Sequence, residues 1–317
     1  MNHLNYAFDS KNQFWRYIVV IILAFLISNT IGAIPVGILI IAGIFKSGSL
    51  DARPENIMDF SAYGIDLNVG LAAMMFAFVV GLIGFALLLK PFHNRTLTGT
   101  INGTRKIRWN RIISGFIVWG ILMVLSLVLT LLIDSESLEF QLKWSTFIPL
   151  FFISLVLIPF QTSFEEITFR GYLMQGVATN THNRIWALVV TSVLFGLLHS
   201  FNPEVKEYGF FATMPEYIGF GAILGLMTLL DDGVELPIGL HTANNFFSSI
   251  LITNKHSVLV TPAIFESEKI NSYVDMITLF AFGAIALFIF SKKYQWNWKT
   301  LTEKVKQPVL EVQEDHQ

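Results

Sequence analysis

Ionisable and amide side chains gather in three short segments of an otherwise apolar part of the chain, between residues 145 and 252. These are a segment with Glu165, Glu166 and Arg170, a segment that ends at His199, and a segment with His241 and Asn245. Charged groups at membrane depth are costly, and they are therefore functional candidates by default. We expect the three segments to share one polar cavity, because burying each group separately would cost more.

The acids and the arginine have helical spacing. If 163–175 is helical, Glu166 and Arg170 lie one turn apart on one face and can pair. Glu165 is rotated about 100° from Glu166 and points elsewhere, which leaves one carboxylate free to act as a general base. Taken alone, the Glu166 and Arg170 pair is also typical of a structural ion pair.

The two histidines inside predicted spans have different neighbours. His241 and Asn245 lie one helical turn apart, so they present an imidazole and an amide to the same spot. Such donors can stabilise a developing oxyanion, and a neutral histidine can also bind a metal. Phe195 lies one turn before His199 and can pack against its ring. Alone, His199 is typical of a packed histidine and Asn245 of a contact between membrane helices.

Composition indicates the elements that position these groups. The 317 residues are 53% hydrophobic and 14% charged, whereas soluble domains carry roughly 25% charged residues. The long apolar runs do not alternate, which excludes a barrel and predicts helices. We expect an all-α, polytopic membrane helix bundle of about eight transmembrane helices. The predicted spans are 17–45, 69–89, 112–133, 145–164, 184–200, 215–230, 234–252 and 272–291.

The sequence leaves open the form of the first span, and it predicts the orientation of the spans in the membrane. Pro35 lies within the long first run, so this run is either one kinked helix or two helices. Lys and Arg of the loop 90–111 and of the segment after residue 291 indicate a cytoplasmic side that holds both termini. Asp231 and Asp232 then fall in a cytoplasmic turn without compensating bases.

The chain shows no linker that would separate domains. We expect a helix bundle over 1–294, with its motif-bearing core at about 145–252, and a polar cytoplasmic tail over 295–317. There is no cysteine, no GxSxG elbow, no Walker A sequence and no GxGxxG fingerprint, so thiol, serine-hydrolase and nucleotide-binding readings lose support. A net charge of −2 without a basic block outside the loops gives no reason to expect nucleic acid as a partner.

In order and spacing, the three segments resemble the motifs of the CAAX protease and bacteriocin-processing family of intramembrane peptidases, also called the Abi family and related to the CAAX prenyl endopeptidase. The motifs are Glu165-Glu166-x-x-x-Arg170, Phe195-x-x-x-His199 and His241-x-x-x-Asn245. They cover about 145–250, one third of the chain. The resemblance implies an intramembrane endopeptidase that cleaves a peptide or a membrane protein in the lipid bilayer, and we expect a bacterial cytoplasmic membrane as its location.

The resemblance also implies a role for each motif residue. Glu165 would activate a water that His199 orients, His241 and Asn245 would stabilise the oxyanion, and Glu166, Arg170 and Phe195 would support them, the first two by holding Glu165. The family has been described both as metal-dependent and as a metal-free glutamate peptidase, and the resemblance favours no cofactor. The HExxH helix of zinc peptidases is absent. Zinc is the alternative, bound by Glu165, His199 and His241 with a position left for water.

Two other classes of function fit the same residues. Buried Glu and His can form the relay of an ion-coupled or proton-coupled transporter, which would continue through further spans. The spans 69–89 and 112–133 carry almost no such polar groups. A non-catalytic immunity or scaffold protein that binds a peptide is the third possibility. The intact motif positions argue against it.

Overall fold

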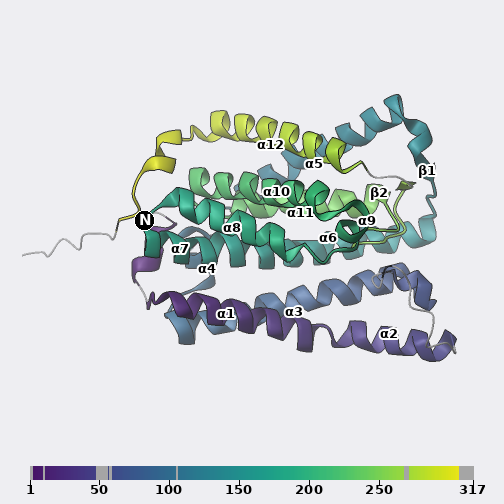
Figure 1. Ribbon diagram of the computed structural model, residues 1–317, viewed down its shortest axis with the longest axis horizontal. Coiled ribbons are helices and arrows are strands. Elements are labelled where there is room, and N and C mark those ends of the chain that lie inside the picture. Colours follow the sequence, from purple (N-terminus) through teal and green to yellow (C-terminus); the bar gives the residue numbers. More distant parts are fainter. Residues whose placement is uncertain are drawn as a thin grey trace, which may run out of the picture.

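Long apolar stretches fold as helices here because a helix satisfies its own backbone hydrogen bonds inside lipid. The computed structural model describes residues 3–9, 11–47, 56, 59–104, 106–267 and 271–306. Within them, long helices run side by side and one small sheet lies at an end (Figure 1). The helices are α1 (Phe14–Ile27), α2 (Ile34–Ser47), α3 (Leu67–His93), α4 (Leu97–Asn102), α5 (Trp109–Ile133), α6 (Trp144–Glu166), α7 (Met174–Thr181), α8 (Arg184–Leu198), α9 (Pro203–Tyr208), α10 (Phe210–Asp231), α11 (Glu235–Leu251) and α12 (Ser272–Tyr294).

The remaining elements are short. Strands β1 (Leu138–Phe140), β2 (Ile252–Thr253) and β3 (Phe265–Ser267) form a sheet in the order β1-β3-β2, antiparallel between β1 and β3 and parallel between β2 and β3. Single turns of 3-10 helix occupy Asn5–Asp9, Phe60–Tyr63, Ser135–Ser137 and Trp298–Thr302, and π-helical turns occupy Ser28–Gly32 and Ile167–Leu173.

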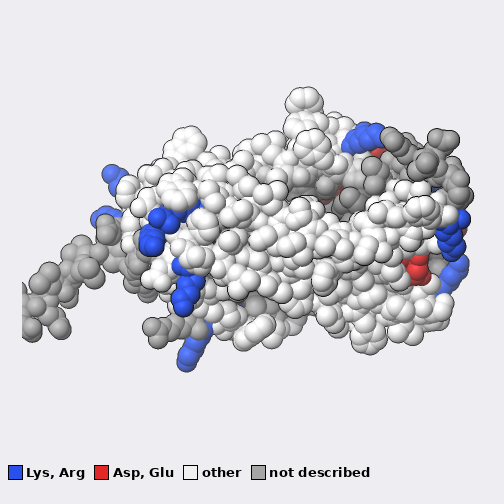
Figure 2. All heavy atoms as spheres, turned by 90° about the horizontal axis from the view of Figure 1, so that it is seen from below, with Lys and Arg blue, Asp and Glu red and all other residues white. Residues whose placement is uncertain are grey.

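The expected all-α polytopic bundle is confirmed. Within the described part of the chain, six helical segments are long and apolar enough to cross a membrane by length and composition: Phe14–Lys46, Leu67–His93, Trp109–Ile133, Trp144–Thr181, Phe210–Asp231 and Ser272–Tyr294. The other two predicted spans are α8 and α11, with 15 and 17 residues. The total of eight spans remains a prediction. Figure 2 shows one face on which Lys and Arg gather toward the two ends and leave a broad uncharged middle.

The first hydrophobic run is one helical segment with a π-helical turn inside it. α1 continues through Ser28–Gly32 into α2, and the whole segment counts as one candidate span. Pro35 explains the irregular turn, because it lacks an N–H and its ring crowds the carbonyl one turn earlier. The hydroxyl of Ser28 donates to the carbonyl of Ala77 at 2.8 Å and fixes the turn against α3.

Contacts between distant segments define two ends of the bundle. At one, which we call the N-terminal end, the His3 amide donates to Asp232 Oδ1 at 2.8 Å and His182 Nδ1 to the Val305 carbonyl at 3.0 Å. The sheet and α9 lie at the opposite end, where the Tyr208 hydroxyl bonds to Asn254 Oδ1 at 3.3 Å. α8 and α11 both run from the N-terminal end toward the opposite end (Figure 1).

The predicted tail is described only as far as residue 306, and 307–317 lie outside the described residues. Residues 48–55 and 57–58, between the predicted spans 17–45 and 69–89, also lie outside them. The described part of the tail packs against the bundle, since Trp296 and Val305 are buried. The boundary between a bundle over 1–294 and a tail over 295–317 and the cytoplasmic side of both termini remain predictions.

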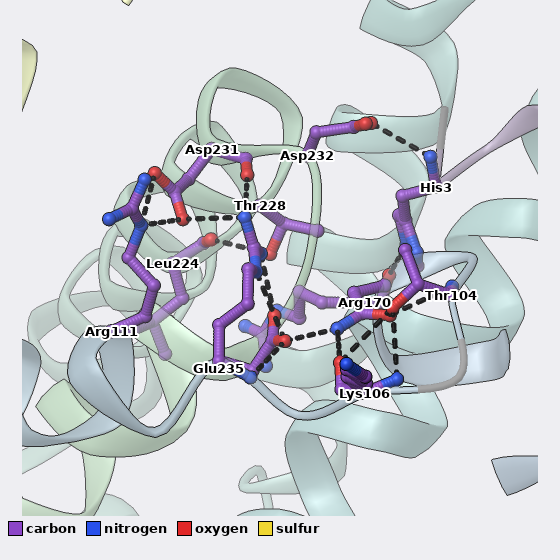
Figure 3. A network of polar contacts seen from close by, with 12 residues as sticks. His3, Thr104, Lys106, Arg111, Arg170, Leu224, Thr228, Asp231, Asp232 and Glu235 are labelled. Atoms are coloured by element: carbon purple, nitrogen blue, oxygen red, sulfur yellow. Dashed lines mark hydrogen bonds and ion pairs between the residues drawn. The ribbon is translucent and has the colours of Figure 1, made fainter. Parts of the chain in front are cut away.

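Asp231 is compensated by bases, contrary to the expectation from sequence. Arg111 Nε lies 2.9 Å and Arg108 Nη1 3.3 Å from Asp231 Oδ2, and Arg108 Nη2 lies 2.6 Å from Glu235 Oε2 (Figure 3). Arg108 is the N-cap of α5 and Arg111 lies in its first turn, both more than a hundred residues before Asp231, so charge counting near Asp231 could not find them. The Asn102 amide donates to Glu235 and the Trp296 indole to Asp231. We call these six residues the end network.

Burial of Arg108 and the acids next to it change its pKa in opposite directions. Burial favours the neutral guanidine, but the hydrogen bond and charge of Glu235, with the charge of Asp231, raise the pKa of Arg108 above its ordinary value. Arg108 therefore stays charged, and the ion pairs of Arg108 and Arg111 with Asp231 and Glu235 tie α5, α10 and α11 together.

α11 lies between α5 and α6, which brings the later motifs next to the first one. Gly239 of α11 permits the approach of α5, because a Cβ there would clash with the Ile112 carbonyl. Because the two backbones lie this close at Gly239, side chains of α5 can reach the polar face of α11.

Candidate active site

The first motif lies where α6 changes into a π-helix. Glu165 and Glu166 are the last residues of α6, and the π-helical turn Ile167–Leu173 carries Arg170. The wider turn shifts the side chains that follow it, and such turns are frequent at functional sites. Every residue of this turn is buried, so its geometry is fixed by packing on all sides.

His241 lies between the two adjacent glutamates. Its Nδ1 donates to Glu166 Oε1 at 2.8 Å, and its Nε2 lies 3.7 Å from Glu165 Oε2. Glu165 and Glu166 leave the helix in different directions, as predicted. The imidazole of His241 nevertheless lies near both carboxylates. With a proton on Nδ1, Nε2 is the nitrogen that faces Glu165.

Glu166 and Arg170 form the predicted ion pair, and it is fully buried. Arg170 Nη1 lies 2.8 Å from Glu166 Oε1, and neither side chain is exposed. The guanidinium also lies 4.1 Å from the centroid of the Phe195 ring. Gly221 of α10 leaves room for it, because a Cβ there would lie 3.1 Å from Arg170 Nη2. The pair holds His241, whereas the family resemblance implied that it holds Glu165.

Glu165 is held instead by a directed series of amides that crosses three helices. Gln161 Nε2 donates to Glu165 Oε1 at 2.8 Å, and Asn245 Nδ2 donates to Gln161 Oε1 at 2.9 Å. Asn244 Nδ2 donates to Asn245 Oδ1 at 3.1 Å, and Trp119 Nε1 donates to Asn244 Oδ1 at 3.0 Å. An indole can only donate, so the direction of every bond in the series is fixed. We call Trp119, Asn244, Asn245 and Gln161 the amide chain.

The amide chain leaves one oxygen of Glu165 without a partner. Oε2 of Glu165 accepts no hydrogen bond within the described part of the chain, although the side chain is 12% exposed. An unpartnered oxygen in a largely buried carboxylate calls for an explanation, and a bound water or substrate supplies one. Glu166 Oε2 is also unpartnered within the described residues, but Glu166 is fully buried, so Glu165 is the more accessible acid of the two.

Sequence reasoning missed three residues of the amide chain. Gln161 lies one turn before Glu165 and Asn244 directly precedes Asn245, so helical spacing could have found both. Trp119 could not have been found in this way, because it belongs to α5 and meets α11 only in the folded bundle.

Asn245 does not have a free donor in this arrangement. Its Nδ2 donates to Gln161 Oε1 and lies 3.3 Å from His241 Nε2. An oxyanion would have to replace one of these acceptors.

His199 joins the site through aromatic contacts. It caps the C-terminus of α8, and its Nδ1 donates to the Phe195 carbonyl at 2.7 Å, which leaves Nε2 available. Its ring stacks on Tyr217 with centroids 4.5 Å apart, and the Tyr217 hydroxyl donates to Glu204 Oε1 at 2.6 Å. The Phe195 ring lies 4.7 Å from His199 and 6.0 Å from His241.

The predicted site residues are therefore connected by two kinds of contact. Glu165, Glu166, Arg170, His241 and Asn245 are linked by hydrogen bonds and short ion-pair distances. No hydrogen bond within the described residues joins His199 to them, and the Phe195 ring is its connection. The expected convergence of Glu165, His199 and His241 on one water remains a prediction.

The residue types suit zinc, but their positions do not form a binding site. A carboxylate and two imidazoles are common zinc ligands. Among the described residues, however, no group of three or more His, Cys, Asp or Glu side chains is placed to hold a metal ion. Zinc bound by Glu165, His199 and His241 does not fit their positions, and we derive no step through it.

Comparison with known proteins assigns this arrangement to a family. The family model described as "Type II CAAX prenyl endopeptidase Rce1-like" matches residues 142–247, which include every residue of the three motifs. The chain is also 31% identical to "Uncharacterized protein YyaK" of Bacillus subtilis (strain 168) over 234 residues, which cover 72% of this chain and 77% of the relative. The predicted family is confirmed, and the six apolar helices make the protein an integral membrane protein. The chain belongs to the type II CAAX prenyl endopeptidase Rce1-like family.

Proposed function

We propose that this protein is an intramembrane endopeptidase in which Glu165 activates the attacking water. Its family supports a protease in general. The observation that carries the finer proposal is the unpartnered Oε2 of Glu165, which lies 3.7 Å from His241 Nε2 while the amide chain holds the other carboxylate oxygen. A general base needs such an open oxygen next to the reacting water.

The proposed reaction uses protein groups alone. Glu165 takes a proton from water, and the water oxygen bonds to the scissile carbonyl carbon to form a tetrahedral intermediate. Glu165 then gives that proton to the amide nitrogen, the carbon–nitrogen bond breaks, and the amine leaves. His199, through its available Nε2, orients the water, as the family motif implies.

The oxyanion would form next to His241 and Asn245. We propose that Asn245 turns one N–H from His241 Nε2 to the substrate oxygen, and that His241, when protonated on Nε2, donates a second hydrogen bond. Glu166 balances the charge of that imidazolium through Nδ1, and Arg170 balances Glu166. The buried pair then serves His241, which is why its removal should affect catalysis as well as folding.

The substrate is proposed as a peptide segment that reaches the membrane. The family description names prenyl endopeptidases, so prenylated and unprenylated peptides are both candidates. We also propose a bacterial cytoplasmic membrane as the location, since the similar protein YyaK is bacterial.

The test is cleavage of a peptide library, with and without prenyl groups, by the purified protein in detergent. We expect wild type to cleave, Glu165→Ala and His199→Ala to be folded and inactive, and a zinc chelator to have no effect. A protein that binds peptides without cutting any would fit the scaffold alternative. Cleavage that survives both substitutions would refute the assignment of Glu165 and His199, and loss of activity with chelator would refute the metal-free reaction.

A further inference from the structure

A pocket at the N-terminal end lies away from the proposed catalytic residues. It has a volume of about 490 Å³, within the usual range for ligand pockets. Its lining residues are Asn5, Arg184, Glu303, Lys304 and Lys306. Three cations and one carboxylate therefore face this space.

The walls of the pocket are tied together by contacts between three segments. Asn183 pairs with Lys304 in a short antiparallel bridge, and the backbones of His182 and Val305 are joined by a hydrogen bond of 3.2 Å. Phe8 of the N-terminal 3-10 turn stacks on His182 with ring centroids 6.0 Å apart. The start of α8, the chain after α12 and the N-terminal turn thus form a fixed rim.

Arg184 is buried in this pocket without a partner. The residue is 4% exposed, its Nε–H donates to no acceptor, and its side chain forms no ion pair or hydrogen bond within the described ranges. Asp232 and Glu303 attract it electrostatically without forming a contact. A buried guanidinium nitrogen without a partner, here Nε of Arg184, is uncommon in native proteins and calls for an explanation.

Other arginines near this end are satisfied by the protein itself. Arg95, which is 3% exposed, donates to the Ala7 carbonyl at 2.8 Å and to the Tyr17 hydroxyl at 2.7 Å. Arg108 is paired with Glu235 within the end network (Figure 3). Arg184 differs from Arg95 and Arg108 in that its side chain has no hydrogen-bond or ion-pair partner among the described residues.

We propose that this pocket binds a phosphate group, with Arg184 as its central ligand. A guanidinium recognises phosphate by parallel hydrogen bonds, and Lys304 and Lys306 add charge. Asn5 Oδ1, which is buried and unpartnered, offers an acceptor to a hydroxyl beside the phosphate. Phosphate occurs in lipid headgroups and as the free ion, and basic pockets between membrane helices commonly bind headgroups. This proposal does not depend on the proposed peptidase function.

The test measures binding to the full-length protein in a detergent free of phospholipid. The probes are inorganic phosphate, short-chain phosphatidylglycerol, and diacylglycerol with the same acyl chains and no phosphate. We expect saturable binding of phosphatidylglycerol, of inorganic phosphate or of both, and none of diacylglycerol. Binding of the lipid alone identifies a headgroup site, and competition by inorganic phosphate identifies a site for the phosphate itself.

Three variants distinguish binding in the pocket from nonspecific attraction by positive charge on the surface. Arg184→Gln should weaken binding at least about tenfold, because it removes charge-assisted hydrogen bonds. Lys304→Gln should weaken it less, and it remains informative if Arg184→Gln fails to fold. Lys299→Gln is the matched control, since Lys299 is exposed on the same segment and does not line the pocket.

Three results would overturn the proposal. One is absence of binding by both phosphate compounds, and another is equal binding of diacylglycerol and phosphatidylglycerol. The third is unchanged binding in Arg184→Gln or an equal loss in Lys299→Gln. Without phosphate, Arg184→Gln should melt at the wild-type temperature, because the Arg184 side chain forms no hydrogen bond or ion pair with the described residues.

Discussion

The end network and the cluster around His241 contain the same kinds of groups but differ in how completely these groups are paired. In the end network, Asp231 and Glu235 each contact a guanidinium and each accept a further N–H. We call Glu165, Glu166, Arg170 and His241 the His241 cluster. There, oxygens of both glutamates and two nitrogens of Arg170 have no partner in the described part of the chain.

This difference separates stability from function. Pairs that satisfy every buried group hold elements together, whereas groups left unsatisfied persist where a ligand or a reaction uses them. The end network ties α5, α10 and α11 into one body, and the His241 cluster uses that rigidity to hold an open carboxylate oxygen. Matched substitutions in the two regions should therefore change different properties of the protein.

The largest expected contrast is between the effects of a Glu→Gln substitution at Glu165 and at Glu235. Glu165→Gln should lower kcat for peptide cleavage between about a hundredfold and ten thousandfold, because the amide cannot accept the proton of water. Its melting temperature should stay at or above that of wild type. Glu235→Gln should lower the free energy of unfolding by about 3 kcal/mol, because Arg108 loses its carboxylate. Cleavage rates and thermal melts of both variants check this, and loss of stability in Glu165→Gln would break the contrast.

The second prediction concerns the buried ion pair. Arg170→Met should lower the free energy of unfolding by roughly 3 to 5 kcal/mol, since Glu166 is left as a buried charge. Adding Glu166→Gln should restore most of this stability but abolish cleavage, because His241 then loses its carboxylate. A double-mutant cycle of denaturant unfolding measures the coupling. Full activity in the double variant would show that the pair serves folding alone.

The third prediction compares two amides that donate to a carboxylate. Gln161→Met should reduce kcat roughly tenfold to a hundredfold, the value of one hydrogen bond to a charged group, with a small change in stability. Asn102→Ala removes the amide that donates to Glu235, so it should reduce stability instead. Kinetics of each variant at matched folded fractions distinguish the two. Equal kinetic effects would contradict the assignment of Gln161 as a positioning residue for Glu165.

The fourth prediction concerns two indoles that each supply one N–H. Trp119→Phe frees the end of the amide chain and should lower kcat by about fivefold, the equivalent of about 1 kcal/mol. Trp296→Phe removes the donor to Asp231 and should lower stability by about 1 kcal/mol at unchanged kcat per folded molecule. If Trp119→Phe keeps the wild-type kcat, the amide chain does not position Glu165.

The smallest expected effect is a pH dependence at the N-terminus. Burial lowers the pKa of His3 below its ordinary 6.5, although Asp232 opposes the shift. The unfolded chain then takes up a proton below pH 6.5 before the folded protein does, so His3 costs stability as the pH falls and nothing above that pH. Hydrogen exchange of residues 3–9 should rise at acid pH in wild type and not in His3→Gln. The same rise in the variant would assign the effect to another group.

Local spacing predicted the parts of the site that lie on one helix. The Glu166 and Arg170 pair, the Phe195 and His199 contact and the closeness of His241 to Asn245 all follow from one helical turn. The contact of His241 with both glutamates could not be predicted, because it depends on how α11 approaches α6. The same holds for Trp119, whose contact requires the close packing of α5 and α11 at Gly239.

Hydropathy predicted the bundle but not its irregular turns or its end contacts. Pro35 marked the first π-helical turn, whereas the turn Ile167–Leu173 contains neither proline nor a pattern that distinguishes it from α-helix. The bases that compensate Asp231 come from the distant N-terminus of α5, and charge counting within the turn therefore gave the wrong expectation.

The most direct test of the account asks whether a carboxylate at position 165 is the base. Glu165→Ala leaves space for a small carboxylate, so added formate should restore part of the lost cleavage in proportion to its concentration. It should not rescue Glu165→Gln, whose amide fills the site, or His199→Ala, which keeps its own carboxylate. Cleavage by Glu165→Ala at the wild-type rate without formate would contradict the proposal that Glu165 activates the water.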